Sequence, residues 1–157
     1  MKMALLMVGK TTDARIVSLI EEYCRRLSHY VTFETEVVPE LRNTRALSTA
    51  QQKEQEGVLI LERVRTGDRL VLLDEKGAER RSTEFAAWME KRMACGAQRL
   101  LFVVGGPYGF SPSVYARADE RISLSQMTFS HQMVRLFFVE QLYRAFSIIN
   151  NEPYHHE

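Results

Sequence analysis

The sequence predicts an α/β fold, with a mostly parallel sheet of five or six strands and helices on both of its faces. Short runs of apolar residues, typical of strands that are covered on both sides, recur along the chain. Amphipathic segments with helical spacing separate these runs, and this alternation is typical of parallel sheets. Since no repeat, low-complexity tract or linker interrupts it, residues 1–157 are expected to form a single domain.

Two strands and two helices are predicted in the first half of the chain. The unbroken apolar run at residues 3–8 indicates a buried strand, and the alternation over residues 31–37 indicates a strand with one more exposed face. Apolar residues recur at helical spacing over residues 13–27. The segment from 48 to about 65 opens on a serine followed three residues later by a glutamine, the capping-box pattern of a second helix.

The middle of the chain predicts one more strand and one more helix. Residues 70–73 are all apolar, which indicates a buried strand, and residues 74–77 are expected to form a loop after it. Ser82 or Thr83 is the expected N-cap of a third helix, which ends at about Ala94, just before a glycine that suits the turn after a helix.

The last third of the chain alternates in the same way. It is expected to contain a strand at 100–104, a loop at 105–111, a short helix at 112–118, a short strand at 122–124 and a final helix at 131–149, capped by Ser130.

The composition is that of an ordinary cytosolic protein. A chain of 157 residues can bury roughly 70% of the surface that its unfolded state exposes. Its first ten residues contain only a short apolar run, far below the roughly 20 residues of a membrane span, so we expect a cytoplasmic protein without a membrane partner. With 21 Lys and Arg against 20 Asp and Glu, the net charge is +1, and an RNA partner would have to be met by local basic patches.

A glycine-rich loop follows the strand at 100–104. Gly105, Gly106 and Gly109 form a GGxxG pattern, which differs from the GxGxxG fingerprint and lacks the lysine of a P-loop. Glycines let backbone N–H and C=O groups approach a flat ligand closely, but they equally serve a purely structural turn. The loop alone leaves both interpretations open.

A second loop precedes the last helix and offers backbone polar groups between apolar side chains, a lining that suits a purine. It is also explained as a simple connection between a strand and a well-capped helix. Its residues are Leu124, Ser125, Gln126, Met127, Thr128 and Phe129.

Several stretches of this chain, in matching order, resemble one family. The chain is similar to the RlmH family, SPOUT-class methyltransferases that modify a pseudouridine in large-subunit ribosomal RNA. The likeness covers nearly the whole chain. It is carried by the stretches MALLMVGK, EEYCRRL, LVLLDEKG, STEFAAWM, GGPYGFS, SLSQMTFSHQMVR, EQLYRA and PYHHE.

The resemblance implies a fold, a reaction and a cofactor. The fold would be the SPOUT α/β knot, with a trefoil knot and the cofactor site within residues 70–157. The reaction would be methylation at N3 of a pseudouridine in 23S ribosomal RNA. The near-neutral net charge of +1 favours the assembled ribosome over naked RNA as the substrate. S-adenosylmethionine would lie between Leu73, the glycine loop and the loop from Leu124 to Phe129. A homodimer is also implied, in which the C-terminal tail packs near the cofactor pocket of the partner subunit.

Four residues are candidates for handling the proton that must leave the acceptor nitrogen. They are His131 and Arg135, which share one face of the last helix, and Tyr154 and His155 in the tail. His131 serves equally well as a cap or as a partner for a buried carbonyl.

No metal site is expected. Two adjacent histidines and Glu157 at the end of the chain lack the geometry of a zinc site.

Two other functions are weighed against this one. A non-catalytic ribosome-binding or assembly factor could retain a SPOUT-like fold with an idle pocket. A Rossmann-like enzyme that uses another nucleotide is disfavoured, because the chain lacks both the GxGxxG fingerprint and the acidic residue that binds the ribose.

Overall fold

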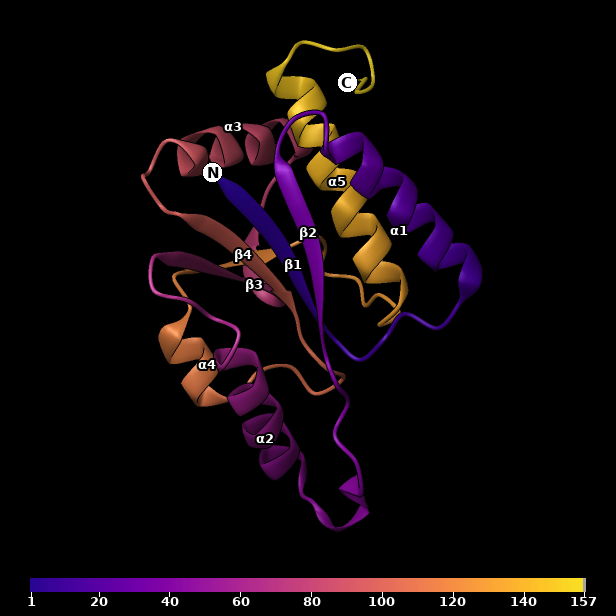
Figure 1. The fold of residues 1–157 in the computed structure, drawn as a ribbon, viewed down its shortest axis with the longest axis vertical. Coiled ribbons are helices and arrows are strands. Elements are labelled where there is room, and N and C mark those ends of the chain that lie inside the picture. The colour runs from indigo at the N-terminus through magenta and orange to yellow at the C-terminus, as the bar shows by residue number, and fades with distance from the viewer. Residues whose placement is uncertain (157) are drawn as a thin grey trace.

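A computed structural model describes residues 1–156 and contains a five-stranded sheet in which all paired neighbours are parallel (Figure 1). The strand order is β2-β1-β4-β3-β5. In chain order the elements are β1 (Lys2–Val8), α1 (Ala14–Leu27), β2 (Thr32–Val38), the 3₁₀ turn η1 (Thr44–Ala46), α2 (Thr49–Leu61), β3 (Asp68–Glu79), α3 (Ser82–Met93), β4 (Arg99–Val104), α4 (Pro112–Arg117), β5 (Glu120–Ser123) and α5 (Met133–Ile149). The predicted parallel α/β architecture is thus confirmed.

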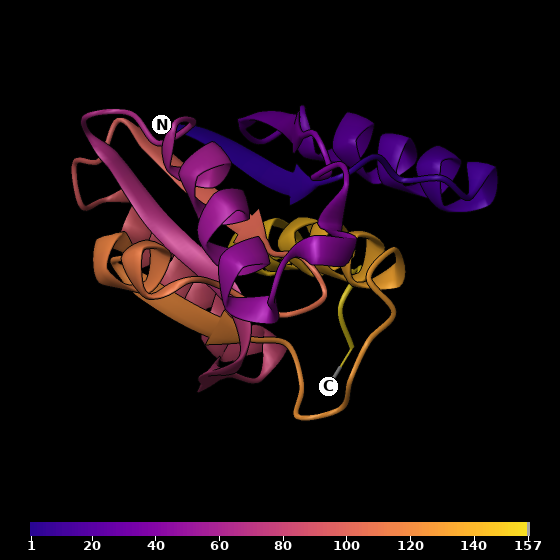
Figure 2. The same ribbon diagram turned by 90° about the horizontal axis from the view of Figure 1, so that it is seen from below.

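Helices cover both faces of the sheet, as predicted. Helices α1, α3 and α5 pack on one face, and α2 and α4 pack on the other (Figures 1 and 2). Successive residues of β1 point to opposite faces, so that Met3 and Leu5 join the first core while Ala4 and Leu6 join the second. This two-sided burial explains why the strands at the centre of the sheet are continuously apolar.

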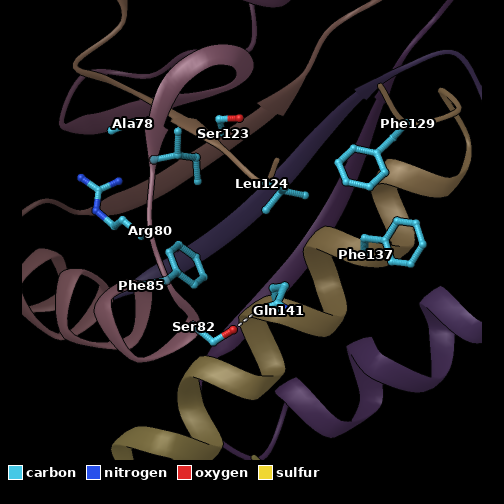
Figure 3. Close-up of a pocket in the computed structure, with 10 residues that line it drawn as sticks. Ala78, Arg80, Ser82, Phe85, Ser123, Leu124, Phe129, Phe137 and Gln141 are labelled. Atoms are coloured by element: carbon cyan, nitrogen blue, oxygen red, sulfur yellow. Dashed lines mark hydrogen bonds between the residues drawn. The ribbon is translucent and has the colours of Figure 1, made fainter. Parts of the chain in front are cut away.

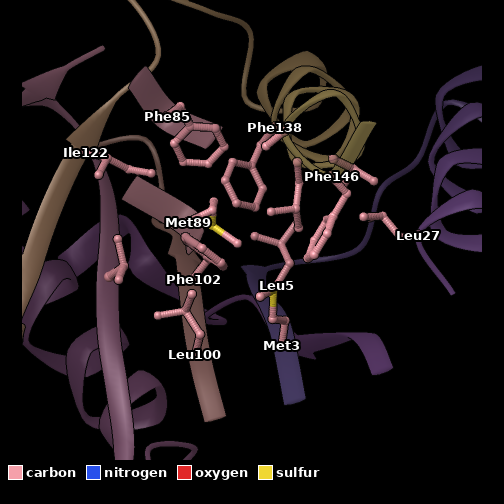
Figure 4. Close-up of a cluster of buried hydrophobic side chains, with 14 of the residues drawn as sticks. Met3, Leu5, Leu27, Phe85, Met89, Leu100, Phe102, Ile122, Phe138 and Phe146 are labelled. Atoms are coloured by element: carbon pink, nitrogen blue, oxygen red, sulfur yellow. The ribbon is translucent and has the colours of Figure 1, made fainter. Parts of the chain in front are cut away.

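Helix α5 lies at the centre of the larger core. Phe138 and Leu142 are completely buried, and the ring of Phe138 lies 4.7 Å from that of Phe102 on β4, measured between centroids (Figure 4). The helix contacts both α1 and α3. Within residues 1–156, neither α5 nor any other helix is both long and apolar enough to cross a membrane.

The predicted loop at residues 74–77 is wrong. Strand β3 continues through it to Glu79, with a shift in register against β5 between Leu73 and Ala78. A Cβ atom on Gly77 would lie 2.6 Å from the backbone carbon of Ile122, so the two backbones are in direct contact. Backbone pairing of this kind leaves no pattern of apolar side chains, and the polar sequence therefore suggested a loop.

The predicted caps of α3 are also wrong. The helix begins at Ser82 with Arg81 as its N-cap, one residue before a cap at Ser82 would allow and two before a cap at Thr83 would, and the backbone N–H of Arg81 donates to the Glu84 carboxylate at 2.8 Å. Ser82 instead donates to the side chain of Gln141 on α5. The capping box at Ser48, by contrast, is confirmed.

Glu120, the first residue of β5, ties this four-residue edge strand to the rest of the fold. Its carboxylate accepts hydrogen bonds from Arg69 on β3 at 2.8 Å and from Trp88 Nε1 on α3 at 2.7 Å, and it also pairs with Arg92. Burial alone would raise the pKa of Glu120, but these donors outweigh burial and lower it to about 2.

We therefore expect Glu120→Gln to destabilise the protein. Because the pKa of the folded state lies below the ordinary value of 4.5, the carboxylate contributes its full stabilisation above that pH and loses it as the pH falls toward 2. The variant should lose about 2 kcal/mol of unfolding free energy at pH 7, and its difference from the wild type should shrink below pH 4.5. Denaturant unfolding across this range measures both. Glu22→Gln, which breaks an exposed pair with Arg26, is the control and should change little at any pH.

Candidate functional site

A pocket of about 650 Å³ opens where β4 and β5 end and where β3 shifts register. Its walls are residues 73–76, the loop after β4, and the long loop between β5 and α5, which Figure 2 shows in orange. Parallel α/β sheets bind their ligands at the carboxyl ends of strands, and the volume is within the range of small-molecule sites.

The structure brings the three predicted cofactor segments together at this pocket. Gln126 is exposed and does not line it. The predicted residues that do line it are Leu73, Gly105, Gly106, Gly109, Leu124, Ser125, Met127, Thr128 and Phe129.

The glycine loop is both a tight turn and a wall of the pocket. Gly109 has a φ of +81°, which L side chains rarely adopt, and its N–H donates to the carbonyl of Gly106 at 3.2 Å. A Cβ atom on Gly106 would lie 2.5 Å from the carboxylate of Glu56. The loop is therefore a structural turn that also lines the pocket, and its role in binding a ligand stays a prediction.

Glu56 on α2 holds this loop in place, and sequence reasoning missed it. Its Oε1 accepts a hydrogen bond from the N–H of Gly106 at 3.0 Å. Burial raises the pKa of Glu56, and the bond from Gly106 opposes that rise. A Cβ atom on the adjacent Gly57 would lie 2.5 Å from the hydroxyl oxygen of Ser111. Helix α2 therefore packs against both ends of the loop. A glycine inside a predicted helix was the available signal, since it indicates close packing.

Asp74 and Tyr115 form a polar part of the pocket lining that the sequence did not reveal. The Tyr115 hydroxyl donates to Asp74 Oδ2 at 2.5 Å, and the guanidinium of Arg121 lies 4.2 Å from the Tyr115 ring centroid. Burial, reinforced by the bond to Asp74, raises the pKa of Tyr115 to about 12. The phenol therefore stays protonated, and the carboxylate keeps free lone pairs for a hydroxyl of a ligand.

His131 and Arg135 lie together, as predicted, but only His131 lines the pocket. Arg135 is completely buried and donates to the carbonyls of Val8 at 2.7 Å and Gly9 at 2.9 Å. Its Nη2 also lies 3.0 Å from His131 Nε2. The same histidine nitrogen lies 3.2 Å from the carbonyl oxygen of Val8, so it either accepts from Arg135 or donates to Val8, depending on which ring nitrogen carries the proton. Arg135 thus fastens the first turn of α5 to the end of β1 and does not face the pocket.

The candidate residues of the tail are held on α1 and α5 of the same chain. Tyr154 donates to Glu140 at 2.9 Å, and its hydroxyl also lies 3.1 Å from that of Tyr23. Arg144 pairs with Glu140 at 2.5 Å and contacts His155 Nδ1 at 3.2 Å. Neither tail residue lines the large pocket of its own chain.

The absence of a metal stays a prediction. Among residues 1–156, no three His, Cys, Asp or Glu side chains are arranged to hold a metal ion. Glu157, the last residue of the tail motif, lies outside the described part of the chain.

Comparison with solved structures supports the fold. The chain is similar to a probable methylase family protein from Haemophilus influenzae Rd KW20, with a TM-score of 0.52 and 12% identity. The match covers 95% of this chain and 66% of that chain, and at this identity it shows the fold alone.

SPOUT methyltransferases are enzymes with a knotted α/β fold and a pocket between loops of this kind, and this chain belongs to that class. The family profile described as "Predicted SPOUT methyltransferase" matches residues 1–155. This membership implies the C-terminal trefoil knot that the resemblance predicted.

The relatives narrow the class further. The chain is 59% identical to ribosomal RNA large subunit methyltransferase H of Parabacteroides distasonis and 57% identical to that of Phocaeicola vulgatus. Each match covers 100% of both chains. The chain therefore belongs to the RlmH family of ribosomal RNA methyltransferases.

We expect Glu56→Ala to loosen the glycine loop. Without the carboxylate, the N–H of Gly106 loses its acceptor, which costs about 1 kcal/mol and raises the exchange rate of this amide roughly fivefold. Glu56→Gln keeps an acceptor oxygen and should retain most of the protection. Amide hydrogen exchange followed by NMR measures the effect.

The matched control is Glu54→Ala on the same helix, where an exposed carboxylate binds only the hydroxyl of Ser113. Equal exchange at Gly106 in the Glu54 and Glu56 variants would show that Glu56 does not position the loop.

Proposed function

We propose that this ribosomal RNA methyltransferase transfers a methyl group from S-adenosylmethionine to N3 of a pseudouridine in 23S ribosomal RNA. The observation that carries the proposal is the full-length match to ribosomal RNA large subunit methyltransferase H at 59% identity. The enzyme acts in the cytoplasm and methylates the assembled ribosome. A net charge of +1 supports this choice of substrate, because a chain without a strong positive field binds naked RNA weakly.

The residues around the large pocket fit S-adenosylmethionine. Gly105 and Gly106 expose backbone groups on one wall, Leu73 and Leu124 supply apolar contacts, and Asp74 can accept from a ribose hydroxyl. When bound, the cofactor supplies an activated methyl group on a positively charged sulfur. The pocket contributes orientation and exclusion of water, which account for much of the rate of a displacement reaction.

Stabilisation of the deprotonated acceptor nitrogen is assigned to the tail. His131 Nε2 lies within hydrogen-bond distance of both Arg135 and the Val8 carbonyl, so that nitrogen is not a free base. His155 Nδ1 accepts from Arg144, which leaves the proton on Nε2, and this nitrogen is buried without a partner in the described chain. Once uncovered at the partner's pocket, this donor beside a guanidinium would stabilise the negative charge that is left when the N3 proton passes to solvent.

The active enzyme is a homodimer in which each tail completes the site of the partner subunit. The observation that supports this proposal is that the tail does not line its own large pocket. Of the apolar residues of α5, Phe137 is 40% exposed. The other apolar residues of α5 are mostly covered by α1, α3 and the sheet, so the apolar excess of this helix is smaller than its sequence suggests.

Labelled methyl transfer tests the reaction. We expect label from S-adenosylmethionine to appear on intact ribosomes from a strain that lacks this protein, and far less on separated large subunits or free ribosomal RNA. Nuclease digestion should place the label on N3-methylpseudouridine. Absence of label on every substrate, together with no thermal stabilisation by S-adenosylhomocysteine, would instead favour a non-catalytic ribosome-binding or assembly factor with an idle pocket.

Subunit complementation tests the composite site. Gly106→Val places side-chain atoms against Glu56 and should block the cofactor pocket, whereas His155→Ala removes the tail donor. Each variant alone should be inactive. Co-expressed subunits should regain roughly a quarter of wild-type activity, because half of the dimers are mixed and each of these has one intact site. Activity that stays absent in the co-expressed sample would show that each subunit uses its own tail.

A further inference from the structure

A second, smaller cavity of about 220 Å³ adjoins the large pocket, and the cofactor site does not account for it (Figure 3). The two cavities share one wall, formed by Ile122, Ser123, Leu124 and Phe129. A group that enters the smaller cavity therefore lies directly beside the large pocket.

Aromatic rings flank this cavity. Phe85 of α3, which is 7% exposed, lies on one side, and Phe129 and Phe137 lie on the other, with Leu124 between them (Figure 3). The rings of Phe129 and Phe137 contact each other, with 5.4 Å between their centroids. Apolar walls with aromatic faces suit a flat ring, and nucleobases stack on such side chains.

An oriented amide forms the polar edge of the cavity. Ser82 donates to Gln141 Oε1 at 2.9 Å, and Gln141 Nε2 donates to Glu140 at 3.2 Å (Figure 3). These bonds fix the plane of the amide but use only one lone pair of its oxygen and one hydrogen of its nitrogen. The amide can still accept from an N–H and donate to a neighbouring C=O.

We propose that this cavity binds the acceptor base, and that Gln141 recognises the N1–H and O2 of pseudouridine. The proposal rests on the function proposed above. Gln141 Oε1 accepts from N1–H and Nε2 donates to O2, which directs N3, the next ring position, toward the wall shared with the large pocket. Uridine in the same orientation offers a carbonyl but has C5–H where pseudouridine has N1–H, so it loses one of the two bonds. The base reaches the cavity by leaving the RNA stack.

Discrimination between the two bases tests the proposal. Single-turnover methylation is compared on ribosomes that carry the pseudouridine and on ribosomes from a strain without the corresponding pseudouridine synthase. The wild type should prefer the pseudouridine substrate by roughly tenfold, because uridine cannot form the hydrogen bond that N1–H donates to Gln141 Oε1. Gln141→Leu should lower the rate on pseudouridine to that on uridine. Phe137→Ala should weaken binding of both substrates.

The controls separate this cavity from the cofactor site and from the dimer. Affinity for S-adenosylhomocysteine should be unchanged in both variants. Val58→Ala, which truncates an apolar side chain that is 51% exposed on α2 and outside both cavities, should behave as the wild type. Three outcomes would overturn the proposal: an equal loss on both substrates in Gln141→Leu, a loss of S-adenosylhomocysteine binding in either variant, or a monomeric Phe137→Ala protein, which would assign the cavity to the second subunit.

A separate measurement keeps the proposal testable if the wild type labels neither ribosome, the result that would overturn the proposed reaction. Pseudouridine 5′-monophosphate is titrated into the protein saturated with S-adenosylhomocysteine, and the side-chain amide of Gln141 is followed by NMR. We expect its signals to shift with pseudouridine 5′-monophosphate and less with uridine 5′-monophosphate. Unchanged signals with both nucleotides would overturn the assignment of the cavity.

Discussion

The burial of β4 on every side is the constraint on which the rest of this structure depends. All six of its residues are buried, with β1 and β3 at its edges and a helical layer on each face. No water reaches its backbone, so both edges must be paired, and parallel pairing requires that each neighbouring strand be reached by a crossover. The chain therefore leaves the sheet repeatedly at one edge, and the loops that build the large pocket meet there.

Sequence reasoning found the parts of the fold that depend on apolar side chains. The strands at the centre, the amphipathic helices and the capping box at Ser48 leave periodic patterns that can be read directly. It did not predict the features that depend on contacts between backbones, such as the extension of β3 past Gly77. The resemblance located the loops of the candidate site, but Glu56 and Asp74 were missed, because their roles depend on contacts with Gly106 and Tyr115 that lie about 40 to 50 residues away.

Several arginines are committed to contacts inside the fold. Arg99 is almost fully buried between Asp68 and Glu36, and it donates to each carboxylate at 2.7 Å. Arg92 is committed to Glu120 and Arg135 to backbone carbonyls. A buried guanidinium needs acceptors for several of its N–H groups. It can therefore connect more than two structural elements at once. These arginines therefore serve the fold, and a substrate rich in phosphate must be met by other side chains.

The anchoring of Arg135 to main-chain oxygens has a consequence for how this family can drift in sequence. The acceptors at Val8 and Gly9 are backbone carbonyls, which no substitution removes, although Gly9 itself is fixed by its φ of +75° and by the Glu40 carboxylate, which would lie 2.4 Å from a Cβ atom. No other side chain has the several coplanar N–H donors of the Arg135 guanidinium. The attachment of α5 to β1 is therefore asymmetric under mutation: its acceptor oxygens belong to the backbone, whereas all of its donors are lost together when Arg135 is replaced.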